Sequence, residues 1–219
     1  MSYVDADLDD QFDEDNIALK SLTSADVQPV RALHSALLPV RYPTSFFIHL
    51  LVHSSSICLV ARASTSNAPI AFISAAIQHN ASPSAGLAPN AAHDESTGVH
   101  VQILTLGVLP KYRNRGLAQR LVRTAVSRLI DSSVPAGITQ VPAPPPARTG
   151  APSTTRGKPD GALVSAHVST SNARAIEFYK RIGLAPSLEI RDLYRGVSSG
   201  SRDAHLVVGY ISLSDKIEP

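Results

Sequence analysis

A helix start that is opened by glycine and surrounded by positive charge is the part of this sequence best suited to chemistry. An apolar stretch ends at Val108, and Gly116 stands where a helical pattern begins. The first amides of a helix have no intrahelical partner and carry partial positive charge, so they bind anions. Gly116 and the small Ala118 would let an anion such as a diphosphate approach the backbone.

Positive charge gathers around this helix start. Six basic residues and no acidic residue lie between positions 99 and 130: Lys111, Arg113, Arg115, Arg120, Arg123 and Arg128. The spacing differs from that of a P-loop, which needs Gly-Lys-Ser/Thr, and from the Gly-x-Gly-x-x-Gly of dinucleotide folds. The charges alone would equally fit an ordinary cationic helix start, so the prediction of an anion site depends on the glycine and the charges together.

Two motifs in the second half of the chain resemble a known family. Arg113-x-x-Gly116-x-Ala118 resembles the Arg/Gln-x-x-Gly-x-Gly/Ala signature of the GNAT acetyltransferases, in which these amides hold the pyrophosphate of coenzyme A. The run from Ser171 to Gly183 resembles the second GNAT block. The resemblance implies acetyl-CoA as the cofactor and a mixed α/β (α+β) fold. In that fold a mostly antiparallel twisted sheet is flanked by helices, with a splayed parallel strand pair at the acetyl-CoA site. The cofactor residues that it implies are Leu106, Val108, Arg113, Asn114, Arg115, Gly116, Leu117, Ala118, Asn172 and Tyr179.

Four shorter segments are similar to a narrower group, the N-alpha-acetyltransferase 50 subfamily, which supplies the catalytic subunit of the NatE N-terminal acetyltransferase. They are Leu38-Pro39-Val40-x-Tyr42, Leu104-Thr105-Leu106-Gly107, His167-Val168 and Asp203-Ala204-His205. The resemblance runs from about residue 17 to 213. It implies acetylation of the α-amine of peptides that begin with Met and an apolar residue. Protein N-termini are then the partners, with NatA-type subunits or the ribosome as further ones, and no nucleic acid, membrane or metal is implied.

His167 is the candidate general base, at the end of a strand that faces the expected acetyl site. In GNAT enzymes the amine attacks the thioester directly, so no nucleophilic serine or cysteine is needed. We expect His167 to act through a water and Tyr179 to donate to the departing thiolate. The amides of Leu106 and Val108 are the expected oxyanion and pantetheine contacts. The alternative for His167 is a histidine of the core, and the alternative for Tyr179 is a tyrosine packed on the sheet. Gln102 stands where the subfamily has a tyrosine that works with the histidine, and an amide can orient water but cannot act as a base.

A slot for the first side chain of the peptide is expected from Leu38, Pro39, Val40, Tyr42 and Tyr194, although Leu193 stands where the subfamily has a second tyrosine. A free α-amine has a pKa near ~7.8 and a lysine near ~10.4, a gap worth roughly 3.5 kcal/mol in deprotonation near neutral pH. A single weak base therefore serves an α-amine more easily. For Leu38-Pro39-Val40 the alternative is a helix terminator packed in the core. For the function of the protein the alternatives are a lysine or small-amine acetyltransferase and a catalytically weak scaffold subunit, which Gln102 favours.

The resemblance implies a single domain over residues 17–214 that positions these groups, and the periodicity of the chain predicts its elements. Strands are expected at 17–22, 57–61, 70–77, 99–108, 163–168 and 206–211, and helices after an Asp26 cap, at 43–51, at 115–130 and at 172–182. Antiparallel neighbours early in the chain and a strand–helix–strand crossover late predict a mixed sheet flanked by helices. We expect a disordered acidic leader at 1–16 and Pro/Ser/Ala-rich loop insertions at about 79–98 and 135–161.

The composition is that of a globular chain with a basic body, since 43% of the 219 residues are hydrophobic and 17% are charged. Residues 1–16 hold seven acids and no base. Without them, 20 basic residues face 11 acidic ones, so the formal net charge of +2 becomes +9, which favours an anionic ligand. Cys58 is the only cysteine, and we interpret it as a buried small hydrophobe in a reducing compartment. We expect neither a secretory signal nor a membrane-spanning segment, and therefore a cytoplasmic protein.

Overall fold

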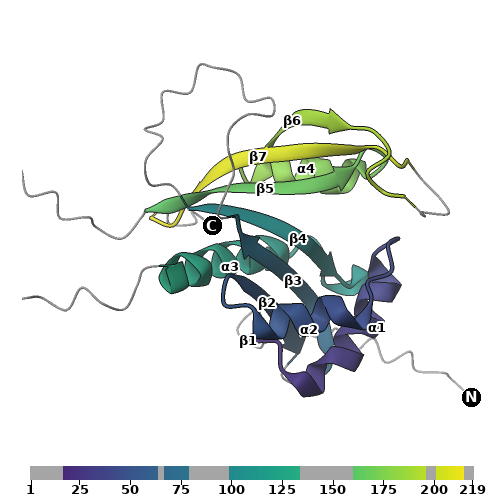
Figure 1. Ribbon diagram of the computed structural model, residues 1–219, viewed down its shortest axis with the longest axis vertical. Helices are drawn as coiled ribbons and strands as arrows, with labels where there is room; N and C mark the ends of the chain where they lie inside the picture. Colours follow the sequence, from purple (N-terminus) through teal and green to yellow (C-terminus); the bar gives the residue numbers. More distant parts are fainter. Residues whose placement is uncertain (1–16, 64–66, 79–98, 134–159, 196–200, 215–219) are drawn as a thin grey trace, which may run out of the picture.

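Seven strands form one continuous sheet in the computed structural model, which describes residues 17–63, 67–78, 99–133, 160–195 and 201–214. The strands are β1 (Ile17–Ser21), β2 (Ser56–Ala63), β3 (Pro69–Ile77), β4 (His100–Val108), β5 (Gly161–Ser169), β6 (Ala185–Ile190) and β7 (Ala204–Ser212). Their order across the sheet is β1-β2-β3-β4-β5-β7-β6, and every neighbouring pair is antiparallel except β4 and β5, which are parallel. Figure 1 shows β1 to β4 in one half of the molecule and β5, β7 and β6 in the other.

Four α-helices flank the sheet within the described ranges: α1 (Val27–Leu37), α2 (Thr44–Val52), α3 (Leu117–Ser133) and α4 (Ala173–Arg181). The longest, α3, makes the crossover that a parallel pair requires between β4 and β5. Its buried side chains recur at helical spacing and form one apolar face: Leu117, Leu121, Val122, Ala125, Val126, Leu129 and Ile130. None of the helices in these ranges is long and apolar enough to cross a lipid bilayer.

The sheet separates two apolar cores. Because side chains alternate between the faces of a strand, Leu59 and Ala61 of β2 belong to the larger core, whereas Cys58 and Val60 belong to the smaller one. The larger core also takes in the buried face of α3 and the side chain of Tyr179 from α4. Residues of α1 and α2 complete the smaller core. The helices of the first half therefore cover one face of the sheet, and α3 and α4 cover the other.

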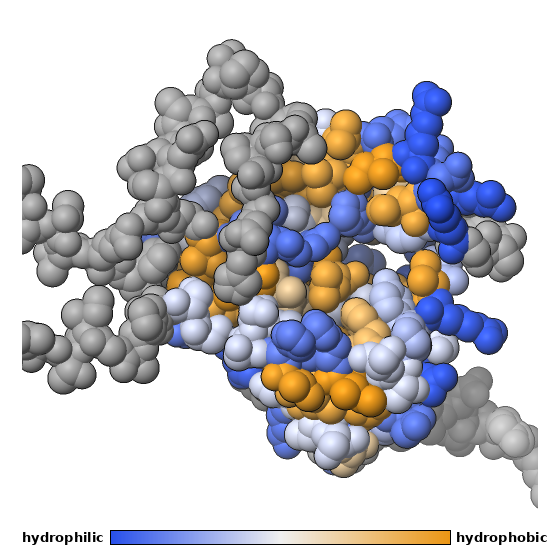
Figure 2. Space-filling model, viewed as in Figure 1, coloured by the Kyte–Doolittle hydropathy of each residue, from blue (hydrophilic) through white to orange (hydrophobic). Residues whose placement is uncertain are grey.

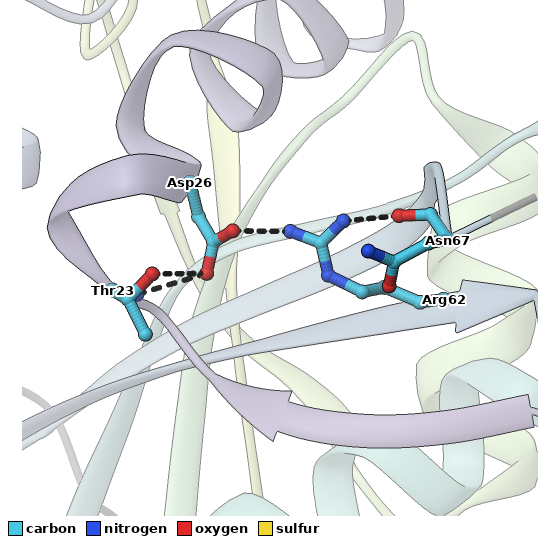
Figure 3. Close-up of polar contacts among 4 residues, drawn as sticks. All are labelled: Thr23, Asp26, Arg62 and Asn67. Atoms are coloured by element: carbon cyan, nitrogen blue, oxygen red, sulfur yellow. Dashed lines mark hydrogen bonds and ion pairs between the residues drawn. The ribbon is translucent and has the colours of Figure 1, made fainter.

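A polar cluster fixes the start of α1 to the sheet (Figure 3). The Asp26 carboxylate accepts hydrogen bonds from the backbone and hydroxyl of Thr23 at 3.0 and 2.8 Å, and it pairs with the Arg62 guanidinium. Arg62 also donates to the carbonyl of Asn67 beyond β2. Burial opposes the charge of the Asp26 carboxyl, but the Thr23 hydrogen bonds and the Arg62 charge outweigh it and lower its pKa. The cluster anchors the helix that leads to the expected peptide slot.

The predicted fold class is confirmed, with a parallel pair inside a mostly antiparallel sheet. Two local predictions differ from the structure. Asp26 occupies the N-cap position of α1 as expected, but its side chain makes no capping hydrogen bond there and accepts instead from Thr23, which precedes the 3-10 turn η2 (Ser24–Asp26). A strand over Ala185–Ile190, β6, was missed, because it is an edge strand whose mostly exposed side chains show no apolar alternation. The leader and most of the two insertions lie outside the described residues.

Candidate active site

The pairing of β4 with β5 ends at Ile103 and Ala166, and the two strands separate beyond these residues. β4 continues to Val108 beside β3, and β5 continues to Ser169 beside β7. The register of β3 and β4 shifts at the separation point, which leaves Leu104 as an extra residue on β4, a β-bulge. Figure 1 shows the two strands diverging, and Figure 2 shows a hollow between the two halves of the molecule.

A row of polar side chains lies along β4 and β5 next to this opening. His100 Nε2 and Ser165 Oγ are 2.9 Å apart, and Gln102 Nε2 lies 3.4 Å from His167 Nδ1. Gln78, directly after β3, donates from its Nε2 to Gln102 Oε1. The fold therefore brings the predicted residues Gln102 and His167 into contact although 65 positions separate them in the sequence.

His167 is half-buried, and burial lowers the pKa of its imidazole. A lowered pKa keeps the ring neutral near pH 7, as a general base requires. The hydroxyl of Tyr194 donates to the His167 carbonyl at 2.9 Å, which ties the chain after β6 to β5. The core-histidine alternative fits less well, since the ring is not fully buried and reaches the polar row rather than an apolar cluster.

Three tyrosines from different parts of the chain, Tyr42, Tyr179 and Tyr194, have raised pKa values because they are buried. Burial, then the neighbouring Tyr42, raises the pKa of Tyr194 to about 12. Burial, then Tyr194, also raises the pKa of Tyr179, whose side chain is 6% exposed. Each phenol therefore keeps its hydrogen throughout the physiological range and can donate it. Tyr179 packs in the larger core, as the second interpretation of this residue expects, and its role as a donor to the thiolate stays a prediction.

The loop between β4 and α3 has the features of an anion cradle. Gly116 has φ +69°, a conformation that favours glycine, and a Cβ built on it would meet nothing within 4 Å. The first helical hydrogen bond runs from the Arg120 amide to the Gly116 carbonyl at 3.0 Å, so the intervening amides lie ahead of the helical ladder. Open space, amides at a helix N-terminus and basic side chains fit the diphosphate of a coenzyme.

The other predicted cofactor residues contribute in different ways. Arg113 donates from Nε to the Val108 carbonyl at 2.9 Å, so it holds the loop to the end of β4. The side chains of Val108 and Leu117 are buried, so only their backbone groups could contact a ligand. Asn172 caps α4, where its side-chain oxygen accepts from the Ala175 amide at 3.1 Å. Leu106 and Ala118 are half-buried, and Asn114 and Arg115 are exposed.

The expected peptide slot starts at the connection between α1 and α2. Leu38 and Val40 are half-buried and Pro39 is exposed, so none of the three is a fully buried core residue. Tyr42 follows them, and its ring packs against Phe46 with the centroids 4.6 Å apart. Tyr42 contributes, after burial, to the raised pKa of Tyr194, whose hydroxyl donates to the His167 carbonyl. Leu193, where the subfamily has a tyrosine, is 38% exposed.

Sequence reasoning missed two residues of the polar row, Gln78 and His100. Each stands at the end of a mostly apolar run, and a polar residue at that place is the only feature of the sequence that could have marked it. A separate cavity of about 220 Å³ lies between α2 and β2, is lined by residues such as Leu50, His53 and Cys58, and contains none of the predicted site residues.

Comparison with known families gives one match. The profile of the acetyltransferase (GNAT) family matches residues 27–141, more than half of the chain. No curated protein sequence matches the chain significantly.

Solved structures of similar fold cover nearly the whole chain. Arabidopsis thaliana NAA60, solved with acetyl-CoA, has a TM-score of 0.63 and 23% identity over 89% of this chain and 98% of its own. Arabidopsis thaliana Naa50, solved with the bisubstrate analogue CoA-Ac-MVNAL, has a TM-score of 0.56 and 20% identity over 88% and 97%. Chaetomium thermophilum Naa20, also with a bisubstrate analogue, has a TM-score of 0.57 and 16% identity over 89% and 86%. At these identities the likeness establishes the fold.

Proposed function

Because the chain belongs to the acetyltransferase (GNAT) family, we propose that it acetylates the α-amine of peptide N-termini, with Met followed by an apolar residue preferred. Acetyl-CoA supplies the acetyl group as a thioester. The amides from Gly116 to Ala118 would hold its diphosphate, because the loop offers open space and a helix N-terminus there. Lys111 and Arg115 add positive charge to the same loop.

The observation that carries the proposal is the hydrogen bond from Tyr194 to the His167 carbonyl beside the separated strands, with Tyr42 contributing, after burial, to the raised pKa of Tyr194. Tyr42 comes from the α1–α2 connection, Tyr194 from the segment after β6, and His167 from β5. The hydroxyl of Tyr194 is bonded to the His167 carbonyl, and Tyr42 influences Tyr194 electrostatically. A peptide terminus entering between Tyr42 and Tyr194 would therefore bring its amine toward His167.

The strength of the base supports an α-amine as the acceptor. In the proposed reaction His167 takes the proton of the amine through a water, and burial lowers its pKa. A base of lowered pKa deprotonates an α-amine, with a pKa near ~7.8, far more easily than a lysine near ~10.4. Tyr179 keeps its phenol hydrogen because burial raises its pKa, and it can donate that hydrogen from Oη.

The polarity of the entrance supports an apolar first residue. Leu38 and Val40 present aliphatic side chains beside Tyr42, whereas the one basic residue of this segment, Arg41, is exposed. A buried Met side chain gains about 1.5–3 kcal/mol, whereas an unpaired carboxylate costs several kcal/mol in such a place. The solved Naa50 structure, whose analogue carries the peptide MVNAL, agrees with this preference.

Two peptides of one sequence test the proposal. The first begins with a free Met-Leu, and the second has its α-amine blocked and keeps an internal lysine; both are incubated with acetyl-CoA and the product is mapped by mass spectrometry. We expect acetylation of the free α-amine only. A third peptide that begins with Asp serves as the specificity control and should react at least about tenfold more slowly.

Each other outcome selects a different function. Comparable acetylation of the blocked peptide would replace the proposal with a lysine acetyltransferase. Acetylation of neither peptide, together with normal coenzyme A binding by calorimetry, would favour the catalytically weak scaffold subunit.

A further inference from the structure

The two glutamines beside His167 form a hydrogen-bond chain with a direction. Gln78 donates from Nε2 to Gln102 Oε1, and Gln102 turns its own Nε2 toward His167 Nδ1 at 3.4 Å. A side-chain amide nitrogen only donates, and an amide oxygen only accepts. Gln102 therefore offers a donor to His167 because its oxygen is engaged by Gln78.

This direction determines which nitrogen of His167 carries the hydrogen. If Gln102 Nε2 donates to His167 Nδ1, then Nδ1 is the acceptor, and the neutral ring has its hydrogen on Nε2. In this tautomer the nitrogen on the far side of the ring from Gln102 is an N–H donor and has no lone pair for a proton. A base that accepts its proton on Nε2, the nitrogen that Gln102 does not contact, needs the opposite tautomer, with the hydrogen on Nδ1.

The opposite tautomer is accessible through a turn of both amides. Gln78 Oε1 would then accept from Gln102 Nε2, and Gln102 Oε1 would accept from His167 Nδ1–H. The number of hydrogen bonds is the same in both directions, so neither direction sacrifices a bond. The 3.4 Å contact is at the long end of the hydrogen-bond range, and Gln78 is exposed at the end of its strand, so both amides have room to turn.

We infer that Gln78 and Gln102 are positioning residues that set the tautomer of His167, with the hydrogen on Nε2 in the free enzyme and on Nδ1 in the form that acts as a base. The inference rests on the proposed function for the role of His167 as a base, but the tautomer itself is a property of the free protein. Gln78 contacts the imidazole only through Gln102, so its effect passes along the chain of amides.

The tautomer is measured by long-range ¹H–¹⁵N correlation spectra of the full chain labelled with ¹⁵N-histidine, without acetyl-CoA or peptide. The signals of His167 are identified by their loss in His167→Asn. We expect an N–H type shift for Nε2 and an unprotonated, acceptor-type shift for Nδ1 in the wild-type protein. A hydrogen on Nδ1 in the free wild-type protein would overturn the inference.

Gln78→Glu tests the direction of the relay. A carboxylate only accepts, so Gln102 would donate to Glu and turn its oxygen toward His167, which moves the ring hydrogen to Nδ1. Gln78→Leu removes the relay partner without adding charge and should leave a mixture of both tautomers. Gln28→Glu makes the same charge change on an exposed residue of α1 and should leave the spectrum of His167 unchanged.

Kinetics with a free-amine peptide provide the second readout. If the base-competent tautomer is the minor one, Gln78→Glu should raise kcat by about threefold or more with little change in KM, since a minor competent state reduces the apparent rate by its fraction. An unchanged tautomer in Gln78→Glu would refute the relay even if the peptide is acetylated. Failure of peptide acetylation would refute the proposed function and leave the tautomer result standing.

Discussion

His34 provides the sharpest test of the fold around the peptide slot. It lies in α1 with 1% exposure, its ring is stacked on Phe72 with the centroids 3.7 Å apart, and it meets Tyr42 and Phe47 edge-on. Within the described part of the chain neither ring nitrogen has a hydrogen-bond partner. Burial lowers the pKa of His34 from 6.5 to about 4, so the ring is neutral in the folded protein.

The sign of the pH dependence follows from the two pKa values. Between pH 6.5 and about 4 the unfolded chain binds a proton at His34 that the folded chain does not, so folding is disfavoured as the pH falls through this window. Above this window His34 is neutral in both the folded and the unfolded state, so no stability is lost. Below it His34 is protonated in both states, and the loss is complete. A shift of this size at 1.36 kcal/mol per pH unit corresponds to about 3 kcal/mol lost on acidification.

Urea unfolding of the wild type and of His34→Leu at several pH values from 7.5 to 4 measures this loss. We expect the free energy of unfolding of the wild type to fall by about 3 kcal/mol more than that of the variant over this range. His49→Leu is the control, because His49 is an exposed histidine of α2. The free energy of unfolding of His49→Leu should fall with pH as steeply as that of the wild type. Equal slopes for the wild type and His34→Leu would show that His34 is not buried as a neutral ring.

Three further predictions concern the cofactor loop, the base and the thiol. Gly116→Asp should abolish coenzyme A binding in calorimetry, because it places a carboxylate against the diphosphate, whereas the equally large Gly116→Asn tolerates a positive φ and should retain more of it. His167→Ala should lower turnover by ~10²–10⁴-fold with coenzyme A affinity nearly unchanged; a smaller loss than in Gln102→Ala would reverse the roles of the two residues. Burial and, second to it, the charge of Asp26 raise the pKa of the Cys58 thiol to about 12. A thiol reagent at pH 8 should therefore label Cys58 only after denaturation. Rapid labelling of the native protein would contradict the burial of Cys58.

The elements that could be predicted from the sequence are those with a local pattern. The apolar stripe of α3 and the alternating or apolar runs of β2, β3 and β4 repeat within a few residues, and the structure confirms each of them. β6 lacks such a pattern, because an exposed edge strand has no face to bury, and its Pro186 is tolerated because it lies on an edge strand next to a register shift. The individual roles of the site residues remain predictions, although His167 and Gln102 do meet.

The sequence by itself was enough to predict an anion cradle, because orphan amides at a helix start, a glycine and nearby basic residues are properties of one short segment. Only the tertiary structure decided which distant side chains face one another. The parallel register of β4 and β5 places Gln102 against His167, and the bulge at Leu104 changes which later residues of β4 face each core. The contact of Gln78 with Gln102 and the hydrogen bond from Tyr194 to the His167 carbonyl likewise depend on strand register and on connections outside any periodic element. Sequence periodicity records which face of an element is buried, but it does not record its register against a neighbour, and the direction of the hydrogen bonds at His167 depends on that register.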